Sequence, residues 1–207
     1  RAAKNEVRTL RAEIRRREEA VVSELILSAD VVLATNVGAA SSALSRSLKK
    51  RDGGFDLVVI DEAAQALEAS CWIPALKGKR LVLAGDHRQL PPTIKCNDGS
   101  VQMGLGRTMF ERAMILYGDG RTDEGGGQTK GAISRMLRMQ YRMNANIADW
   151  ASEATYGGNL MSHHSVRDHK LADLPNIDAG GGDSAVSVTL LLIDTVGCDM
   201  YESVNSA

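Results

Sequence analysis

"LVLAGDHRQLPPT", residues 81–93, joins a short apolar run to a polar loop that closes with two prolines. A second stretch, "LVVIDEAAQ" at residues 57–65, likewise runs from apolar residues into acidic ones. Strands that are apolar throughout, without alternation, are typical of a parallel sheet that is buried on both faces. The two stretches therefore predict neighbouring strands, each of which ends in polar side chains.

Further apolar runs and intervening helical patterns extend this prediction along the chain. "VVLAT" at residues 31–35 and "VSVTLLLID" at residues 186–194 also predict buried strands. Helical patterns at about residues 63–76 and 104–117 follow the strands. Such alternation of strands and helices indicates an α/β layer fold with a parallel sheet.

The first 28 residues predict a long helix, because they contain no proline or glycine and are rich in helix formers. Glu13 and Arg17, at i and i+4, would add slight support. The expected arm is a solvated amphipathic helix, with a coiled-coil arm as a second interpretation. The apolar residues at helical spacing along one face are Val7, Leu10, Ile14, Val21 and Leu25.

The second half of the chain begins with a glycine-rich stretch, residues 118–132, which predicts a loop or linker. Beyond it, "NANIADWASEATYGG" at residues 144–158 predicts a helix that stops at the Gly157-Gly158 pair. The residues expected to share one face of this helix are Ile147, Trp150, Ala151 and Ala154.

Composition narrows the class of protein. A net charge of −1 does not indicate a strongly basic nucleic-acid binder, although a local basic patch is compatible with that average. No apolar run approaches the ~20 residues that cross a bilayer, so no membrane association is expected. The wide spacing of Cys71, Cys96 and Cys198 predicts reduced thiols in a cytoplasmic or nuclear protein.

The acidic residues at the strand ends suggest a site for chemistry. Asp61 and Glu62 follow one predicted strand and Asp86 follows the next, and ligands of open parallel sheets bind beyond such carboxyl ends. Carboxylates there suit Mg²⁺ and a water-orienting base, but acids also occur at ordinary helix N-termini. Gln89 can both donate and accept, so it could contact a terminal phosphate and a water together. Pro91 and its neighbour stiffen this loop.

Several stretches, in order, resemble the motifs of superfamily 1 helicases. "DEAAQALEASCWIPAL" (61–76) resembles motif II and "LAGDHRQLPPT" (83–93) resembles motif III. "LRMQYRMNANIADWAS" (137–152) resembles the motif that carries "QYRM", and "VVLATNVGA" (31–39) and "LLLIDTVGC" (190–198) resemble flanking strands. The sequences of these motifs resemble those of the nonsense-decay helicase group. Within that group, they most resemble the immunoglobulin-mu-binding type of DNA/RNA helicase.

The resemblance implies two RecA-like α/β domains, the first partial and without its opening strand, the second barely begun. The implied division is a helical arm at 1–28, part of the first motor domain at 29–117, a linker at 118–132, and the start of the second motor domain at 133–207.

The resemblance also implies an ATP site with Mg²⁺. In that site Asp61 holds the metal, Glu62 polarises the attacking water, and Gln89 reads the γ-phosphate. Asp86 supports the loop geometry, and Gly85 lies beside the nucleotide. Such groups stabilise phosphoryl transfer mainly by position and charge.

The resemblance also implies roles for residues that lie outside the part of the ATP site formed by the first domain. Arg142 of "QYRM" would be an arginine finger from the second domain, although a pairing role within its own helix is the alternative. Thr35 and Asn36 would lie near the backbone of single-stranded RNA or DNA, although Thr35 could simply satisfy a turn.

The sequence contains no G-x-x-x-x-G-K-[ST], the phosphate cradle of such enzymes. We therefore expect an internal fragment of an ATP-dependent helicase, inactive alone, whose parent translocates on single-stranded nucleic acid. The alternative is a degenerate homologue that binds nucleic acid or serves as a scaffold without hydrolysing ATP. The sequence identifies no protein partner.

Overall fold

The structure, a computed structural model, describes residues 2–50, 54–117, 133–177 and 184–198. The chain divides into two compact units, Arg1–Ser134 and Arg135–Ala207, and each is described by itself. The glycine-rich stretch predicted as a linker, residues 118–132, lies outside the described residues.

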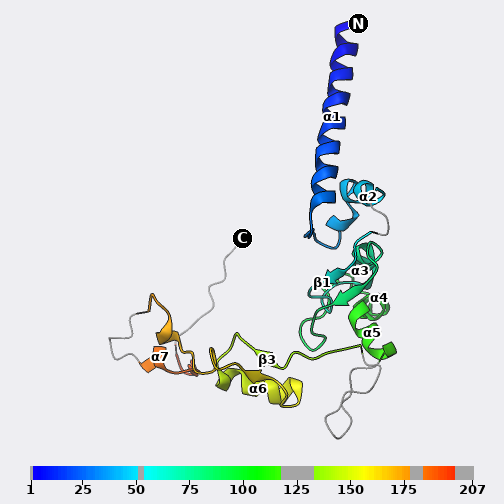
Figure 1. Cartoon of the computed structure of the whole chain (residues 1–207). Helices are drawn as coiled ribbons and strands as arrows, with labels where there is room; N and C mark the ends of the chain where they lie inside the picture. The colour runs from blue at the N-terminus through cyan, green and yellow to red at the C-terminus, as the bar shows by residue number, and fades with distance from the viewer. Residues whose placement is uncertain (1, 51–53, 118–132, 178–183, 199–207) are drawn as a thin grey trace. The chain divides into compact units, whose positions relative to one another are not determined.

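Unit 1 begins with α1 (Ala2–Ser28), the long helix that the absence of proline and glycine predicts (Figure 1). Its C-terminal part packs against α2 (Ser42–Leu48), where the hydroxyl of Ser47 donates to that of buried Ser23 at 3.2 Å. The predicted Glu13–Arg17 pair is present at 2.9 Å. The apolar residues of the predicted face are all exposed, by 48% to 65%. Among the described helices, none combines the length and apolar character that a membrane span requires.

Residues 31–35 do not form the predicted strand. They run without regular structure into the short 3-10 helix η1 (Gly38–Ala40), and Val31 and Leu33 are exposed by 74% and 91%. A strand exists only through hydrogen bonds to a neighbouring strand. Within the described part of the chain, residues 31–35 have no such neighbour, so apolar character alone was insufficient.

The central element of unit 1 is a parallel pair, β1 (Val58–Ile60) and β2 (Leu81–Leu83), with Val59 opposite Val82. The connection contains α3 (Glu68–Ala75), which packs against β1. The predicted parallel arrangement is therefore confirmed for these strands. The predicted helix of residues 63–76 starts only at Glu68, because the backbone of residues 61–66 forms turns at the strand end.

The prediction that both faces of this sheet are buried was wrong. Ile60 is 4% exposed, but Val59 and Val82 are exposed by 59% and 47%. One face is covered by the helices that follow the two strands, and the described residues of unit 1 supply no cover for the other. The core cluster consists of Ile60, Ala63, Cys71 and Met109, with Val58, Ala66, Leu83 and Phe110 packed against it.

The single helix predicted at residues 104–117 is instead two helices, α4 (Gly99–Gly106) and α5 (Met109–Tyr117). The break is caused by Thr108, whose hydroxyl accepts from the amide of Glu111 at 3.1 Å. The Glu111 carboxylate in turn accepts from the amide of Thr108 at 3.0 Å. This reciprocal capping box starts a new helix at Met109.

Unit 2 contains a second parallel pair, β3 (Met139–Gln140) and β4 (Met161–Ser162), connected by α6 (Ala145–Tyr156). Gly157, at φ +59°, ends α6 as predicted. The buried residues of α6 are Ala148 and Ser152, whereas Trp150 of the predicted face is 74% exposed. Ser152 lies inward because its hydroxyl bonds both the amide and the carbonyl of Leu160.

The strand predicted at residues 186–194 is also absent. The short helices η2 (Leu171–Asp173) and α7 (Ser184–Ser187) precede a non-regular stretch in which Leu192 is 92% exposed. In the described part of unit 2, the ladder of β3 and β4 does not extend to this stretch, so it has no pairing partner.

Candidate functional site

The carboxyl ends of β1 and β2 bring the two acidic stretches together. The amide of Ala84 donates to the carbonyl of Ile60 at 2.9 Å, and the amide of Ala63 donates to the carbonyl of Ala84 at 2.8 Å. Because these bonds continue the pairing past the strands, the turn after β1 lies directly against the loop after β2. Residues that are about 25 positions apart in sequence thus share one edge of the sheet.

Gly85 is required by this close approach. A Cβ atom at Gly85 would lie 2.9 Å from the amide nitrogen of Ala64 and 3.1 Å from that of Ala63. Both contacts are with backbone, which cannot rotate away as a side chain can. The glycine that was expected beside a nucleotide therefore has a structural reason to be there: it allows the two loops to touch.

Asp61 and Glu62 are exposed at this edge. Asp61 Oδ1 accepts from the amide of Glu62 at 3.0 Å, and the Glu62 carboxylate accepts from Gln65 Nε2 at 3.0 Å. Glu62 has φ +51°, a left-handed conformation that is uncommon outside glycine and clusters at functional sites. The backbone of this turn therefore holds Glu62 in a conformation that it would rarely adopt alone.

The donor set fits a magnesium ion. Asp61 and Glu62 offer carboxylate oxygens, the ligands that this hard cation prefers. Neither forms an ion pair with a lysine or arginine among the residues that the structure describes. Each carboxylate accepts one hydrogen bond from within the turn and is otherwise open to solvent, as is expected of side chains that can take up a cation.

Asp86 organises the loop after β2. Its Oδ1 accepts from the amide of Arg88 at 2.9 Å, and its Oδ2 accepts from Gln89 Nε2 at 2.8 Å. The amide of Gln89 donates to the Asp86 carbonyl at 3.2 Å, which closes the turn. A glutamine amide has two N–H donors, so one remains for a phosphate oxygen while the other bonds Asp86.

Thr35 and Asn36 lie at the N-terminal side of η1. The Thr35 hydroxyl accepts from the amide of Gly38 at 2.9 Å, which is the turn role considered as the alternative for this residue. Asn36 Nδ2 donates to the hydroxyl of Ser70 at 3.3 Å. Because Ser70 is on α3, the side chain of Asn36 is anchored to the helix that follows Asp61 and Glu62.

Arg142 lies in unit 2, on a turn that follows β3, and its side chain is exposed. Gln140 orders this turn: its Oε1 accepts from the amides of Arg142 and Met143, both at 2.7 Å. Its Nε2 donates to the hydroxyl of Ser162 on β4 at 2.6 Å. Gln140 was not predicted as a site residue, although it is the first residue of "QYRM". Arg142 belongs to unit 2, whereas Asp61 belongs to unit 1.

An ion pair between α3 and α5 was not predicted from the sequence. Arg112 donates to both carboxylate oxygens of Glu68, from Nε at 3.0 Å and from a terminal nitrogen at 2.6 Å. Trp72 Nε1 donates to the same carboxylate at 3.1 Å. The Arg112 hydrogen bonds hold the pKa of Glu68 below its usual value. Glu68 and Arg112 are 44 residues apart, and no local pattern links them.

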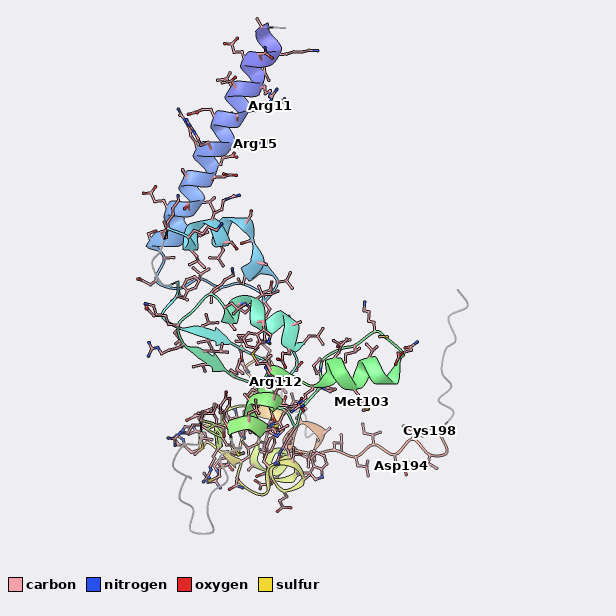
Figure 2. The ribbon with its side chains drawn as sticks, turned by 90° about the vertical axis from the view of Figure 1, so that its right-hand side faces the viewer. Arg11, Arg15, Met103, Arg112, Asp194 and Cys198 are labelled. Atoms are coloured by element: carbon pink, nitrogen blue, oxygen red, sulfur yellow. The ribbon has the colours of Figure 1, made fainter. Side chains whose placement is uncertain are left out.

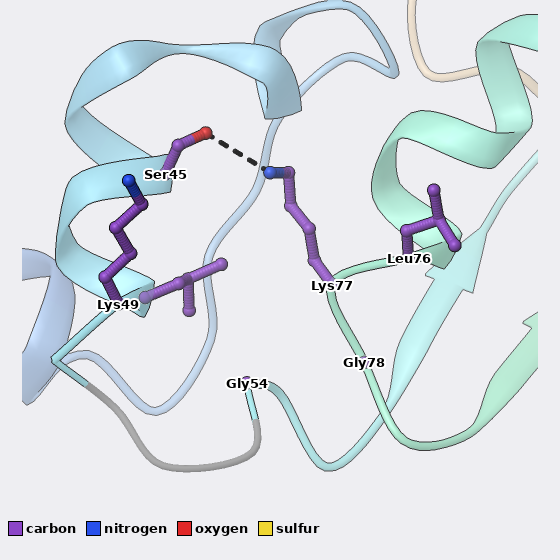
Figure 3. A pocket seen from close by; sticks show the side chains of 7 residues that line it. Ser45, Lys49, Gly54, Leu76, Lys77 and Gly78 are labelled. Carbon is purple, nitrogen blue, oxygen red and sulfur yellow. Dashed lines mark hydrogen bonds between the residues drawn. The ribbon is translucent and has the colours of Figure 1, made fainter.

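A hollow of about 310 Å³ lies at the opposite, amino-terminal end of the strands (Figure 3). Within it Lys77 Nζ donates to the hydroxyl of Ser45 at 3.3 Å. Gly54 and Gly78 precede β1 and β2, so this hollow is separate from the edge that carries the carboxylates. The residues that line it are Ser45, Leu48, Lys49, Gly54, Leu76, Lys77 and Gly78.

This sequence is similar to known proteins over nearly its whole length. Residues 1–97 and 105–206 match two family models, each described as an AAA domain. DNA-binding protein SMUBP-2 of Mesocricetus auratus is 47% identical over 199 residues, which cover 96% of this chain and 18% of that protein. DNA polymerase alpha-associated DNA helicase A of Saccharomyces cerevisiae is 34% identical over 213 residues, or 98% of this chain and 29% of that protein.

A further relative extends the group. Regulator of nonsense transcripts 1 of Dictyostelium discoideum is 35% identical over 147 residues, which cover 70% of this chain and 10% of that protein. The chain thus spans less than a third of the length of each of these relatives. From the AAA-domain matches and these relatives together, the chain belongs to the superfamily 1 helicases of the nonsense-decay helicase group.

Proposed function

We propose that this chain is part of an ATP-driven helicase that couples ATP hydrolysis to movement along single-stranded RNA or DNA. The observation that carries the proposal is the shared strand edge, where the Ala63–Ala84 hydrogen bond holds the Asp61–Glu62 turn against the Asp86–Gln89 loop. Two relatives are named for DNA, as a DNA-binding protein and as a DNA helicase, and a third for nonsense transcripts. Single-stranded RNA and single-stranded DNA are therefore both candidates for the nucleic acid that stimulates ATP turnover.

The residues at the strand edge have distinct proposed roles. Asp61 would hold Mg²⁺, which when bound neutralises charge on the phosphates of ATP. Glu62 would accept a hydrogen bond from the attacking water and take its proton as the general base. Gln89, held by Asp86, would donate its second N–H to the γ-phosphate. Gly85 allows this loop to approach the turn that carries both carboxylates.

The remaining proposed roles belong to groups away from this edge. Arg142 would stabilise charge on the transferred phosphoryl group, as an arginine finger does. Its exposed side chain and ordered turn support that role. Thr35 and Asn36 would lie near the nucleic-acid backbone, with the anchor from Asn36 to α3 as a physical link to the ATP edge. The three cysteines are thiols, which supports a cytoplasmic or nuclear location.

The proposed domain division follows from the same family. Residues 29–117 would be part of a first RecA-like motor domain and residues 133–207 part of a second, with α1 as a helical arm and residues 118–132 as the linker. Since the sequence lacks the phosphate cradle, we expect no ATP turnover from this chain alone.

The direct test uses the complete protein that contains this chain and replaces Glu62 by Gln. We expect the kcat for ATP hydrolysis to fall by about 100-fold or more, because the base is lost, while the affinity for ATP changes little. Turnover of ATP with saturating single-stranded RNA and DNA and binding of a fluorescent ATP analogue give the two quantities.

Glu18→Gln on exposed α1 is the matched control, and it should leave both quantities unchanged. Unchanged turnover in Glu62→Gln would contradict the assignment of the base. If the unsubstituted complete protein binds nucleic acid but hydrolyses no ATP, the protein is a non-hydrolysing nucleic-acid-binding homologue instead.

A further inference from the structure

The ion pair of Glu68 and Arg112 joins the two helices that follow the strand ends. Glu68 is the first residue of α3. Arg112, which is labelled in Figure 2, lies in the first turn of α5. The two side chains are 26% and 37% exposed, and the arginine contacts both carboxylate oxygens. Trp72, one turn further along α3, donates to the same carboxylate. A two-pronged contact of this kind fixes the direction of approach as well as the distance.

The loop that contains Gln89 starts and ends at one hydrophobic cluster. Leu83, the last residue of β2, packs against the cluster, and Met109, the first residue of α5, belongs to it. Cys71 of α3 is another member. Both ends of the segment between Leu83 and Met109 are therefore fixed to the same small core. The position of α5 determines where the C-terminal end of this segment lies.

An aromatic contact extends from α5 to the loop itself. The rings of His87 and Phe110 are stacked, with centroids 6.1 Å apart and planes at 27°. His87 lies between Asp86 and Gln89, and Phe110 precedes Arg112 in the first turn of α5. A shift of α5 would thus be transmitted to the residues on either side of His87.

We infer that Glu68 and Arg112 are positioning residues that hold α5 against α3 and thereby keep Gln89 in register with the Asp61–Glu62 turn. The inference rests on the proposed function, because it assigns the pair a role in ATP turnover through Gln89. Partly exposed ion pairs add little to stability, so directional restraint is the effect to test. Loss of the pair lowers kcat while the KM for ATP stays near its original value.

The first experiment tests the pair in this chain without any nucleotide. Trp72 and Trp150 are the two tryptophans, so Trp150→Phe leaves one indole N–H signal, that of the group that donates to Glu68. This signal is followed by NMR as the pH is lowered, with and without Arg112→Gln. The expected result is a lower titration midpoint when Arg112 is present. Equal midpoints would overturn the ion pair and the inference with it.

The second experiment measures turnover in the complete protein. Arg112→Gln should lower kcat about 10-fold or more with little change in KM. Arg112→Lys, which keeps the positive charge but not the bidentate contact, should recover part of the loss. In a Gln89→Ala background, Arg112→Gln should cause little further loss, because both changes remove the same restraint. Arg46→Gln, which breaks the exposed pair with Glu19, is the control and should not alter kcat.

The outcomes separate the inference from the function on which it rests. Equal losses from Arg112→Gln with and without Gln89 would show a general structural role and overturn the inference alone. A Gln89→Ala protein with full kcat would overturn the γ-phosphate contact proposed for Gln89, and with it the inference. If Arg112→Gln fails to fold, Arg112→Lys and Glu68→Gln complete the same double-mutant comparison.

Discussion

The β1–β2 sheet with its covering helices and the helix α1 both contain many apolar residues, but only the sheet region buries them. In the sheet region, Ile60 is 4% exposed and Cys71 is fully buried, because α3 and α5 cover one face of the sheet. Along α1, Leu10 and Leu25 are 56% and 65% exposed. The helical period thus predicted which residues share a face, but burial depends on whether another element covers that face.

The charged residues of the two regions differ in the same way. Glu13 of α1 pairs with Arg17, one turn away on its own helix, and the side chains of Arg11 and Arg15 also extend from this helix (Figure 2). Glu68 of α3 pairs with Arg112, which is 44 residues away in sequence. The Glu13–Arg17 pair is therefore local and follows from spacing, whereas the Glu68–Arg112 pair follows from packing.

The largest expected difference between the regions is in the effect of truncating an apolar side chain. Ile60→Ala should lower the free energy of unfolding by about 2–4 kcal/mol, because it leaves a cavity in the small core. Leu10→Ala on exposed α1 should change it by no more than about 0.5 kcal/mol. Urea unfolding of the chain, followed by Trp72 fluorescence in a Trp150→Phe background, measures both. Similar losses would mean that the face of α1 is covered in solution.

A smaller effect is expected from a single added methyl group. Gly85→Ala should destabilise unit 1 by about 1–3 kcal/mol, because the new Cβ would meet backbone nitrogen at 2.9 Å. Gly104→Ala in α4, where an added Cβ would have no atom within 4 Å beyond the adjacent backbone of its own helix, should stabilise by about 0.5–1 kcal/mol through helix propensity. The same unfolding assay applies. A neutral Gly85→Ala would contradict the close contact of the two loops.

The smallest expected effect is a pH dependence of the free energy of unfolding that arises from the Glu68–Arg112 pair. The Arg112 hydrogen bonds lower the pKa of Glu68 from 4.5, so the pair stabilises the folded chain above pH 4.5. This contribution is lost as the pH falls through the lower pKa of the folded state. The stability difference between the chain and Glu68→Gln should therefore shrink below pH 4.5.

Urea unfolding at a series of pH values gives this difference. Glu13→Gln is the matched control on α1, and it removes an exposed helical pair that contributes about 0.5 kcal/mol or less. A difference for Glu68→Gln that stays constant with falling pH would contradict the lowered pKa.

Part of the fold could be predicted because it depends on neighbours along the chain. The parallel strands after Leu57 and Arg80, the long first helix and the stop at Gly157 all follow from local runs and spacing. The strands predicted at 31–35 and 186–194 were wrong because apolar residues form a strand only when a partner strand lies beside them. The break at Thr108 had a local signal, the T-x-x-E capping box, which the helical pattern concealed.

The sequence by itself determined the family and the residues that stand at the strand ends, among them Asp61, Glu62 and Asp86, because apolar runs and motif order are properties of the linear chain. The tertiary structure alone decided the close approach at Gly85, the anchor from Asn36 to Ser70 and the pair of Glu68 with Arg112. The physical reason is range. Hydrogen bonds within a turn or helix join residues at most a few positions apart, whereas contacts over 34 or 44 positions exist only after the elements have packed.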